Sequence, residues 1–533
     1  MQREGIKMKK RLLVISVAVV LLVNGCGSAP LYSEAPPSEE PAYEAEPAYE
    51  HPAEEEYDFA TAEEWFDDAP SDYYQYDDES YLVIDENRAE STEYESTVTL
   101  SLKVDTASYT NVARYIHAGE LPPEDAVKTE EFLNYFSYDN KMKDKQGPFY
   151  LSAEVGESPY DEDKQFALIR VKTDDIPKED LPPSNLTFLI DTSGSMDSHD
   201  KLPLLQEAFS LLVDTLDEDD RVSIVTYAGS SRVILDSATG ADKFEIMDAI
   251  DSLEAGGSTY GEGGIQKAYK LAERNYIKNG NNRIILATDG DFNVGVSSTR
   301  GLEELISEKK DSGINLSILG FGMGNLKDDN METLSKYGEG NYSYINSVKD
   351  ARKVLVDELG STLFTVAKDV KAQVEFNPAV VKSYRLLGYE NRMLNNEDFD
   401  DDNKDAGEIG AGTDVVMMFE LEMKDIEDSK YQDELFELRI RYKEPDGDRS
   451  EEIVKPVYKE DIVKNESEDF KFACAVVGFS HLLRGSDALG NLDIRQIGKM
   501  ATNNRGDDEG KYRKEFVRMI GTYMDTYGST KTI

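Results

Sequence analysis

The chain has 533 residues, which is enough for two to four domains with hydrophobic cores of their own. It carries 107 Asp and Glu residues against 58 Lys and Arg residues, a formal net charge of −49. Because phosphate binding needs a basic surface, this balance argues against nucleic acid and anionic lipid surfaces as partners. We expect most of the acidic charge to lie on solvated surface.

Residues 1–25 are predicted to be a lipoprotein signal peptide. Lys9, Lys10 and Arg11 precede the apolar run "LLVISVAVVLLV" at 12–23, which is too short to span a bilayer comfortably. The sequence "VNGC" follows and resembles a bacterial lipobox, in which Cys26 would be lipidated and become the mature N-terminus. This resemblance predicts a lipid anchor on the extracytoplasmic face of the cell membrane, at the cell surface or in the periplasm.

Residues 26–95 are predicted to form a disordered acidic stalk. The segment is rich in Pro, Glu, Ala and Tyr, as in "EEPAYEAEPAYEHPAEEEY". Like charges and proline keep such a chain extended and deny it a core. We therefore expect this segment to hold the rest of the chain away from the membrane.

Residues 96–184 are predicted to form a small α+β module. The patterning predicts a helix at 106–119 and strands at 96–105, 149–160 and 165–173. The segment "DDIPKEDLPPSN" then marks a linker by its prolines.

Residues 185–360 alternate between apolar strands and amphipathic helices. Strands are expected at 186–191, 221–229, 231–237, 283–290, 314–322 and 341–345. Helices are expected at 201–216, 243–253, 261–277, 301–313, 331–339 and 349–360. This alternation predicts an α/β domain with a doubly wound, mostly parallel sheet, whose ligands bind beyond the carboxyl ends of the strands.

Residues 361–533 are predicted to form a β-rich domain with terminal helices. Strands are expected at 369–377, 381–390, 414–423 and 435–444, and helices around 468–484 and 510–526. The helices could pack on this β-rich part or on the preceding α/β domain.

Oxygen-bearing side chains gather at the predicted carboxyl edge of the parallel sheet. Asp191 ends the strand "LTFLID", and Ser193 and Ser195 follow it in a tight turn. Asp289 ends a later apolar strand, and Thr259 lies in the glycine-rich loop "AGGSTYGEGG". These are hard oxygen donors without Cys or His, a set that suits Mg²⁺.

The segments "DTSGSM", "GGST" and "TDG", in this order, resemble the metal-ion-dependent adhesion site (MIDAS) of von Willebrand factor type A (VWA) domains. The resemblance implies that Ser193 and Ser195 bind the metal directly and that Thr259 binds it directly or through water. Asp191 and Asp289 would bind it mainly through water. The implied metal is Mg²⁺, with Mn²⁺ and Ca²⁺ as alternatives, and no catalytic residue or small-molecule cofactor is implied.

The flanking segments extend the resemblance. Residues 104–139 and 384–412 look like the companion segments of a group of bacterial lipoproteins that carry a VWA domain. The leading hypothesis is a non-enzymatic, lipid-anchored protein whose metal site binds an Asp or Glu of a protein partner. One alternative is a metal-dependent hydrolase at the same site with Asp291 or Glu262 as base. Another is a scaffold role, in which the flanking modules bind the partner.

Other motifs fit enzymes and ligand loops less well. Ser193 stands where a haloacid-dehalogenase phosphatase needs its second Asp. Ser195 lies in "SGSMD", which is not the G-x-S-x-G turn of a serine hydrolase, and the nearby His199 is expected to be incidental.

Two further loops mimic ligand-binding motifs. The turn "GFGMG" at 320–324 lacks the spacing of a dinucleotide loop. The acidic loop 398–408 resembles an EF-hand, but Asn403 replaces the required Gly and Ile409 replaces the required Glu. A solvated loop is favoured there, and weak Ca²⁺ binding stays open.

Overall fold

The computed structural model describes residues 78–528, except for 104, 139–141, 178–179, 260, 291, 293–304, 310–311, 425–433, 446 and 491–492. The chain divides into two units, Met1–Asp72 and Tyr73–Ile533, and every described residue belongs to the second. The predicted signal peptide, Cys26 and most of the predicted stalk therefore lie outside the described residues. Within the described part, no helix is long and apolar enough to cross a membrane.

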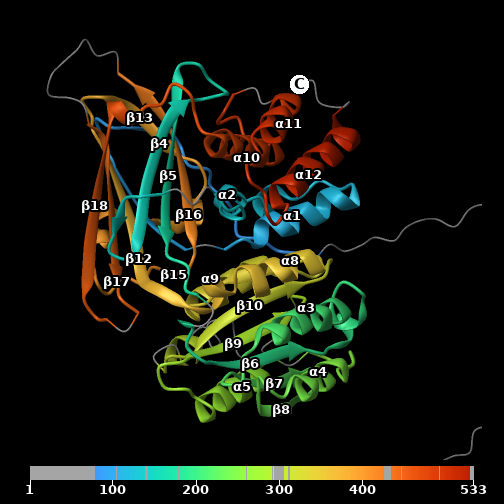
Figure 1. Ribbon diagram of the computed structural model, residues 1–533. Coiled ribbons are helices and arrows are strands. Elements are labelled where there is room, and N and C mark those ends of the chain that lie inside the picture. Colours follow the sequence, from blue (N-terminus) through green and yellow to red (C-terminus); the bar gives the residue numbers. More distant parts are fainter. Residues whose placement is uncertain are drawn as a thin grey trace, which may run out of the picture. The chain divides into compact units, whose positions relative to one another are not determined.

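A six-stranded sheet forms the centre of the region from residue 184 to residue 345. Its order is β11-β10-β9-β6-β7-β8, and every pairing is parallel except that of the edge strand β8 with β7. The strands are β6 (Ser184–Asp191), β7 (Arg221–Tyr227), β8 (Ser231–Thr239), β9 (Asn281–Thr288), β10 (Asn315–Phe321) and β11 (Tyr342–Ile345). This topology confirms the predicted doubly wound sheet, visible in the lower half of Figure 1.

Helices cover both faces of this sheet. One hydrophobic cluster joins β6 and β7 to helices α3, α4 and α8, and a second joins β7, β9 and β10 to α5 and α7. The helices are α3 (Leu202–Thr215), α4 (Lys243–Asp251), α5 (Glu262–Arg274), α7 (Asp328–Tyr337) and α8 (Val348–Arg352). A π-helical turn (Lys353–Asp357) and α9 (Leu359–Leu363) follow α8. Since both faces are covered, the strand β6 is buried along its whole length.

Two further sheets combine strands from both flanks of this α/β region. The first has the order β1-β13-β16-β5-β4-β3, and the second has the order β14-β2-β12-β17-β18 with β15 beside β12. The strands before residue 184 are β1 (Glu90–Ser91), β2 (Thr97–Ser101), β3 (Lys145–Gln146), β4 (Phe149–Glu157) and β5 (Lys164–Thr173). Those after residue 363 are β12 (Thr365–Phe376), β13 (Val381–Leu386), β14 (Met393–Leu394), β15 (Gly407–Gly410), β16 (Asp414–Met423), β17 (Glu434–Lys443) and β18 (Ser450–Tyr458).

The strand pairs β5–β16 and β2–β12 show how closely the two flanks are joined. Both pairs are antiparallel, with Ile169 opposite Met417 and Val98 opposite Val374. Inward-facing side chains of the two sheets form one shared hydrophobic core. The flanking segments therefore build one body together, while the predicted boundaries between them stay predictions.

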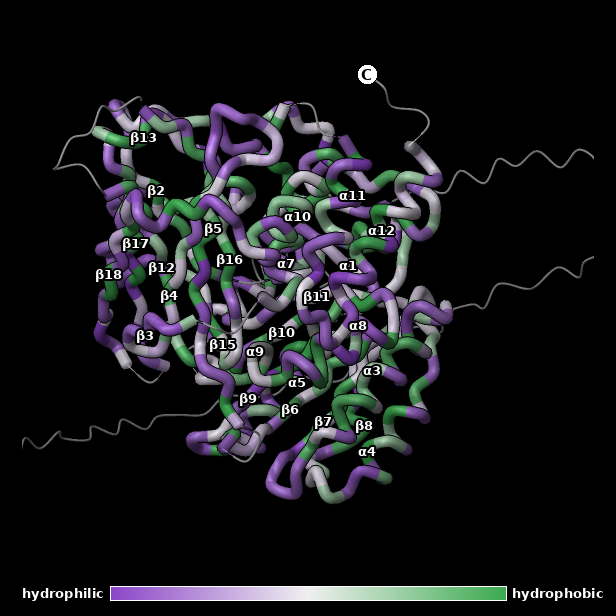
Figure 2. The backbone as a smooth tube through the Cα atoms, turned by 45° about the horizontal axis from the view of Figure 1, so that its top comes forward, coloured by the Kyte–Doolittle hydropathy of each residue, from purple (hydrophilic) through white to green (hydrophobic). Residues whose placement is uncertain are grey.

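Helices cover the outer face of the first of these sheets. They are α1 (Ala107–Ala118), α2 (Thr129–Asn134), α10 (Glu468–Arg484), α11 (Ile494–Asn503) and α12 (Tyr512–Tyr527). Apolar residues of β5 and β16 meet those of α10 in one cluster, seen as green stretches near these labels in Figure 2. Cys474 is buried in α10, as its apolar surroundings in the sequence predict.

The segment 78–95 differs from the predicted stalk. Thr92 is buried and its hydroxyl donates to the Val381 carbonyl at 2.7 Å, and β1 pairs with β13. Glu79 is bound by the Arg114 guanidinium at 2.7 Å and 2.8 Å. Because these residues have partners in distant segments, they fold onto the compact part although their composition resembles the stalk.

Candidate metal site

The carboxyl end of β6 carries the first group of predicted site residues. Asp191 is fully buried, and the backbone N–H of Ser193 donates to its Oδ1 at 2.8 Å. The hydroxyl oxygens of Ser193 and Ser195 lie 3.0 Å apart. The apolar strand thus brings a carboxylate into the interior, and the turn behind it gathers two hydroxyls beside that carboxylate.

The glycine-rich loop of Thr259 lies against this turn. The backbone N–H of Gly256 donates to the Thr192 carbonyl at 2.8 Å, and that of Gly194 donates to the Gly257 carbonyl at 3.0 Å. Gly257 has a φ of +87°, which favours glycine. The half-buried Thr259 therefore follows a loop that is hydrogen-bonded to the Asp191 turn.

Asp289 directly follows β9, the parallel neighbour of β6. The Thr288 hydroxyl donates to Asp191 Oδ2 at 3.4 Å, which links the two strand ends. Asp289 is fully buried; its Oδ2 accepts from Lys201 Nζ at 2.9 Å, and its Oδ1 has no hydrogen-bond partner among the described residues. A buried acceptor without a partner is costly, so this oxygen is suited to a ligand.

The electrostatics of Asp191 reflect a shortage of positive charge. Burial raises the pKa of Asp191 to about 6, since hydrogen bonds from Ser193 only partly offset burial and the nearby Asp289 charge adds to it. None of the ion pairs among the described residues includes Asp191, and the carboxylate that Lys201 contacts is Asp289. Of these two buried carboxylates, Asp289 is thus paired with a cation and Asp191 has no ion pair in the described part of the chain.

The chemistry of these residues fits a hard divalent cation. We call Asp191, Ser193, Ser195, Thr259 and Asp289 the rim. Among the residues that the structure describes, no three His, Cys, Asp or Glu side chains group to hold a metal. A metal at the rim would therefore need the hydroxyl oxygens besides the two carboxylates, as Mg²⁺ accepts.

Lys201 and Asn325 are rim neighbours that the sequence reasoning missed. Lys201 precedes α3, and its Nζ donates to Asn325 Oδ1 at 2.9 Å as well as to Asp289. Neither residue belongs to the three motif segments, so spacing along the chain carries no signal for them. The nearest hint is the glycine-rich turn after β10, which brings Asn325 to the rim.

Support for hydrolytic chemistry is sparse in the described part. Asp291 lies outside the described residues, and the side chain of Glu262 is not described. Among the described residues, the Ser195 hydroxyl pairs with that of Ser193, and no hydrogen bond joins it to a histidine. His199 is exposed.

A Ser–His–Glu group elsewhere also lacks the geometry of a catalytic triad. His481 Nδ1 lies 3.1 Å from Ser486 Oγ and 3.2 Å from Glu86 Oε1, so both partners face the same ring nitrogen. A triad needs its acid and its nucleophile on different nitrogens. This group instead fastens the segment around Glu86 to α10.

The acidic loop 398–408 is occupied by a lysine of its own chain. Lys371 Nζ donates to the Asp398 carbonyl at 2.8 Å and to the Asp401 carbonyl at 2.5 Å. Carbonyls that a calcium ion would need are thus bound to an ammonium group, in line with the preference for a solvated loop over an EF-hand.

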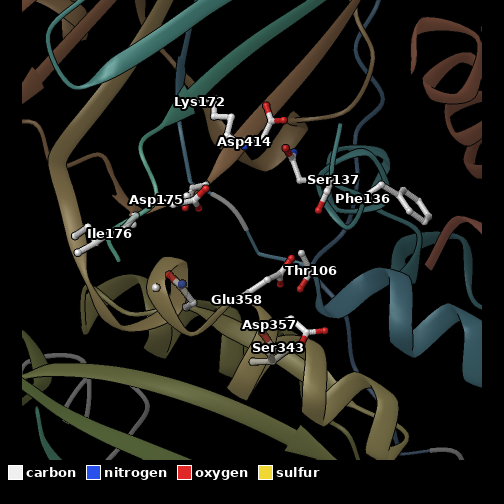
Figure 3. A pocket seen from close by; sticks show the side chains of 18 of the residues that line it. Thr106, Phe136, Ser137, Lys172, Asp175, Ile176, Ser343, Asp357, Glu358 and Asp414 are labelled. Atoms are coloured by element: carbon white, nitrogen blue, oxygen red, sulfur yellow. The ribbon is translucent and has the colours of Figure 1, made fainter. Parts of the chain in front are cut away.

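A cavity of about 340 Å³ lies where the three parts of the chain meet (Figure 3). Its lining includes Thr106, Asp175, Asp357, Glu358 and Asp414. Two of these carboxylates are already paired, Asp414 with Arg170 and Glu358 with Lys353. The cavity is separate from the rim and contains none of the predicted site residues.

Comparisons with known proteins agree with the fold. Residues 185–358 match the family described as von Willebrand factor type A domain, residues 75–168 match one described as von Willebrand factor, and residues 361–525 match "Uncharacterized protein YfbK, C-terminal". Among solved structures, a von Willebrand factor type A protein from Catenulispora acidiphila aligns with 72% of this chain and 91% of its own, at 14% identity and a TM-score of 0.41.

Relatives with similar sequences differ in how much of this chain they match. Human inter-alpha-trypsin inhibitor heavy chain H2 is 29% identical over 148 residues, which is 26% of this chain and 16% of that protein. "Uncharacterized protein YfbK" of Escherichia coli (strain K12) is 43% identical over 462 residues, covering 83% of this chain and 80% of that protein. The chain therefore belongs to the YfbK family of proteins that contain a VWA domain.

Proposed function

We propose that this protein binds a protein partner through a divalent cation held at the rim. The VWA domain is a fold commonly used for protein–protein interaction. The observation that carries the proposal is the unpartnered Asp289 Oδ1, which lies beside the fully buried Asp191, a carboxylate without an ion pair. Mg²⁺ would supply the missing positive charge and leave one coordination position for an Asp or Glu of the partner.

Each rim residue would have its own task. The hydroxyls of Ser193 and Ser195, which lie 3.0 Å apart, would bind the ion directly. Thr259 would bind it directly or through water, from a loop that is hydrogen-bonded to the same turn. Asp191 and Asp289 would hold water molecules of the ion and balance its charge.

The position of the protein in the cell is part of the same proposal. The "VNGC" motif supports lipidation of Cys26, and the acidic segment behind it supports a stalk on the extracytoplasmic face of the membrane. The high negative charge fits this arrangement, because an acidic chain is repelled by anionic lipid surfaces.

Calorimetric titration of the purified full chain with MgCl₂ tests the metal site. We expect saturable binding that Asp191→Ala and Asp289→Ala abolish. Asp251→Ala is the matched control, because it removes an exposed carboxylate at the end of α4 in the same domain. Absence of saturable binding, or equal binding by Asp191→Ala, would contradict the proposal.

Capture of a partner tests the acidic ligand. Proteins that bind the immobilised chain in Mg²⁺ should be released by chelator and should not bind the Asp191→Ala variant. Blocking Asp and Glu side chains of the captured partner by amidation should abolish its binding. A partner that stays bound in chelator would show that surfaces other than the rim do the binding.

A further inference from the structure

Lys201 places a buried ammonium group at the rim. Its side chain is 9% exposed, and its Nζ lies 2.9 Å from both Asp289 Oδ2 and Asn325 Oδ1. Lys201 contacts Oδ2 of Asp289, and Oδ1 of the same carboxylate has no hydrogen-bond partner among the described residues. The lysine thus occupies one side of Asp289 and leaves the other oxygen for a ligand.

The stem of Lys201 is held by a glycine of the turn after β10. Gly322 has a φ of +72°, and a Cβ added there would lie 2.3 Å from both Cγ and Cε of Lys201. Any larger residue would push the lysine out of place. Gly322 of the "GFGMG" turn thus has a structural role, because it leaves the space that the side chain of Lys201 occupies.

The loop that carries Asn325 is fixed from two sides. Gly290 has a φ of +119°, and a Cβ there would lie 2.3 Å from the Asn325 carbonyl oxygen. On the other side, Glu79 Oε1 accepts from the Gly324 N–H at 2.7 Å, and the Ser80 N–H donates to the Leu326 carbonyl at 3.0 Å. Asn325 and Lys201 therefore have little freedom to leave Asp289.

We propose that Lys201 is a positioning residue that acts as a resident cation: it orients Asp289 in the metal-free protein and weakens the affinity of the rim for a divalent cation. This inference rests on the proposed metal site and adds the residue that regulates it. Without Lys201, neither of the two buried carboxylates would have an ion-pair partner among the described residues. With Lys201 in place, an incoming Mg²⁺ meets one uncompensated negative charge instead of two, and it is repelled by the ammonium group.

Two linked measurements on the full chain test the role of Lys201. In Lys201→Met, which keeps the stem but removes the charge, we expect the Kd for Mg²⁺ to fall by at least about tenfold in calorimetric titration. The melting temperature in chelator should fall, and the upward shift on adding Mg²⁺ should be larger than in the wild type. Lys201→Gln keeps a hydrogen-bond donor without the charge, and it should also lower the Kd for Mg²⁺ and the melting temperature in chelator.

The controls separate charge from packing. Lys201→Arg restores the positive charge and should return the Kd to within about threefold of the wild type. Lys243→Met removes a half-buried lysine at the start of α4, whose Nζ donates to the Asp214 carbonyl at 2.7 Å, and it should leave both measurements unchanged.

The possible results distinguish this inference from the proposed function. If the wild type binds Mg²⁺ and Asp191→Ala does not, but Lys201→Met and Lys201→Gln bind it no more tightly than the wild type, the role of Lys201 is refuted and the metal site stands. If neither the wild type nor Lys201→Met binds Mg²⁺, both proposals are wrong.

Discussion

Two of the places where the protein buries charged side chains differ in how many cations they hold. In the first, at the rim, Lys201 pairs with Asp289, and Asp191 belongs to none of the ion pairs among the described residues. The second place, which we call the three-segment cluster, consists of Lys103, Asp105, Lys128, Glu131, Asp328, Glu332 and Arg392. Its members come from the region before the parallel sheet, from α7 within the α/β domain, and from the segment before β14.

Cations in the three-segment cluster are shared between carboxylates. Lys128 Nζ lies 2.8 Å from both Asp328 and Glu332, and Arg392 Nη2 lies 2.6 Å from Asp105 and 3.0 Å from Glu332. Burial alone would raise the pKa of Glu332, but the charges of Lys128 and Arg392 outweigh it and hold this pKa below its usual range. Lys128 and Arg392 therefore stabilise the charge of Glu332 without a ligand.

Burial raises the pKa of a carboxylate where nearby cations do not outweigh it. Asp191 at the rim has its pKa raised to about 6, chiefly by burial. Glu131, whose carboxylate lies 3.5 Å from Lys128 Nζ, also has a raised pKa, because burial and the neighbouring carboxylates outweigh that contact. Burial raises the pKa of Asp328 as well, although Lys128 Nζ lies 2.8 Å from it. Glu332, which two close cations hold, belongs to the framework, whereas a buried carboxylate without close cations is a place where a cation can still bind.

The largest expected effect comes from Lys128→Met. This change leaves Asp328 and Glu332 buried without their closest cation, and breaking such a pair costs about 3–5 kcal/mol. Urea unfolding followed by circular dichroism measures the loss. If Lys128→Met is no more destabilising than Lys201→Met in chelator, the contrast between the cluster and the rim fails. The cluster would then contribute no more to stability than the rim does.

Arg392→Met should have a smaller effect, about 2–3 kcal/mol, because Glu332 keeps Lys128 and Asp105 keeps Lys103 at 3.5 Å. Urea unfolding again measures it. Calorimetry should show an unchanged Kd for Mg²⁺, since the ion pairs of Arg392 in the described part of the chain go to Asp105 and Glu332 and not to a rim residue. A large change of this Kd would mean that the two charge groups are coupled.

The sequence predicts elements better than it predicts their partners. Helix α10 was expected at 468–484 and lies at Glu468–Arg484, because a long apolar run with a Ser cap is a strong local signal. The short α11 and the exposed edge strand β18 were not predicted, since their apolar content is low. The pairing of β5 with β16 was also not predicted, because alternation shows that a strand has a buried face but not which strand lies beside it.

The candidate site shows the same limit. Asp191 and Asp289 could be recognised because each directly ends an apolar strand, and parallel strands end at one edge. Lys201 and Asn325 could not, because their contact depends on the close approach that Gly290 and Gly322 allow between loops. Local patterns locate residues on elements, whereas loop packing decides which of them touch.

Glu79→Gln tests whether the loop beside the rim is held from outside. Its carboxylate binds Arg114 through two oxygens and accepts from the Gly324 N–H, so we expect a loss of about 1–3 kcal/mol. Hydrogen exchange by mass spectrometry should show faster exchange around Gly324 and no change in α10. Unchanged exchange at Gly324 would mean that other contacts fix Asn325.

The Glu79 carboxylate should also make the stability of the protein depend on pH. Burial raises the pKa of Glu79, but hydrogen bonds and charge from Arg114 outweigh it and lower this pKa to about 2. The stabilisation is therefore complete above the unfolded pKa of about 4.5 and is lost as the pH falls towards 2. The stability difference between wild type and Glu79→Gln should shrink between pH 6 and pH 3, and a constant difference would contradict this assignment.

Lys455→Met should have the smallest effect. Lys455 pairs with Asp144 at 2.8 Å, as close as Lys128 pairs with Asp328, but the two side chains are 22% and 44% exposed. Water already solvates both charges, so the unfolding free energy should change by less than about 1 kcal/mol. Since the distances are equal, the contrast between Lys455→Met and Lys128→Met reflects burial together with the larger number of carboxylates that Lys128 holds. If both variants lost similar stability, the shortage of cations around Asp191 would no longer distinguish the rim from an ordinary surface carboxylate.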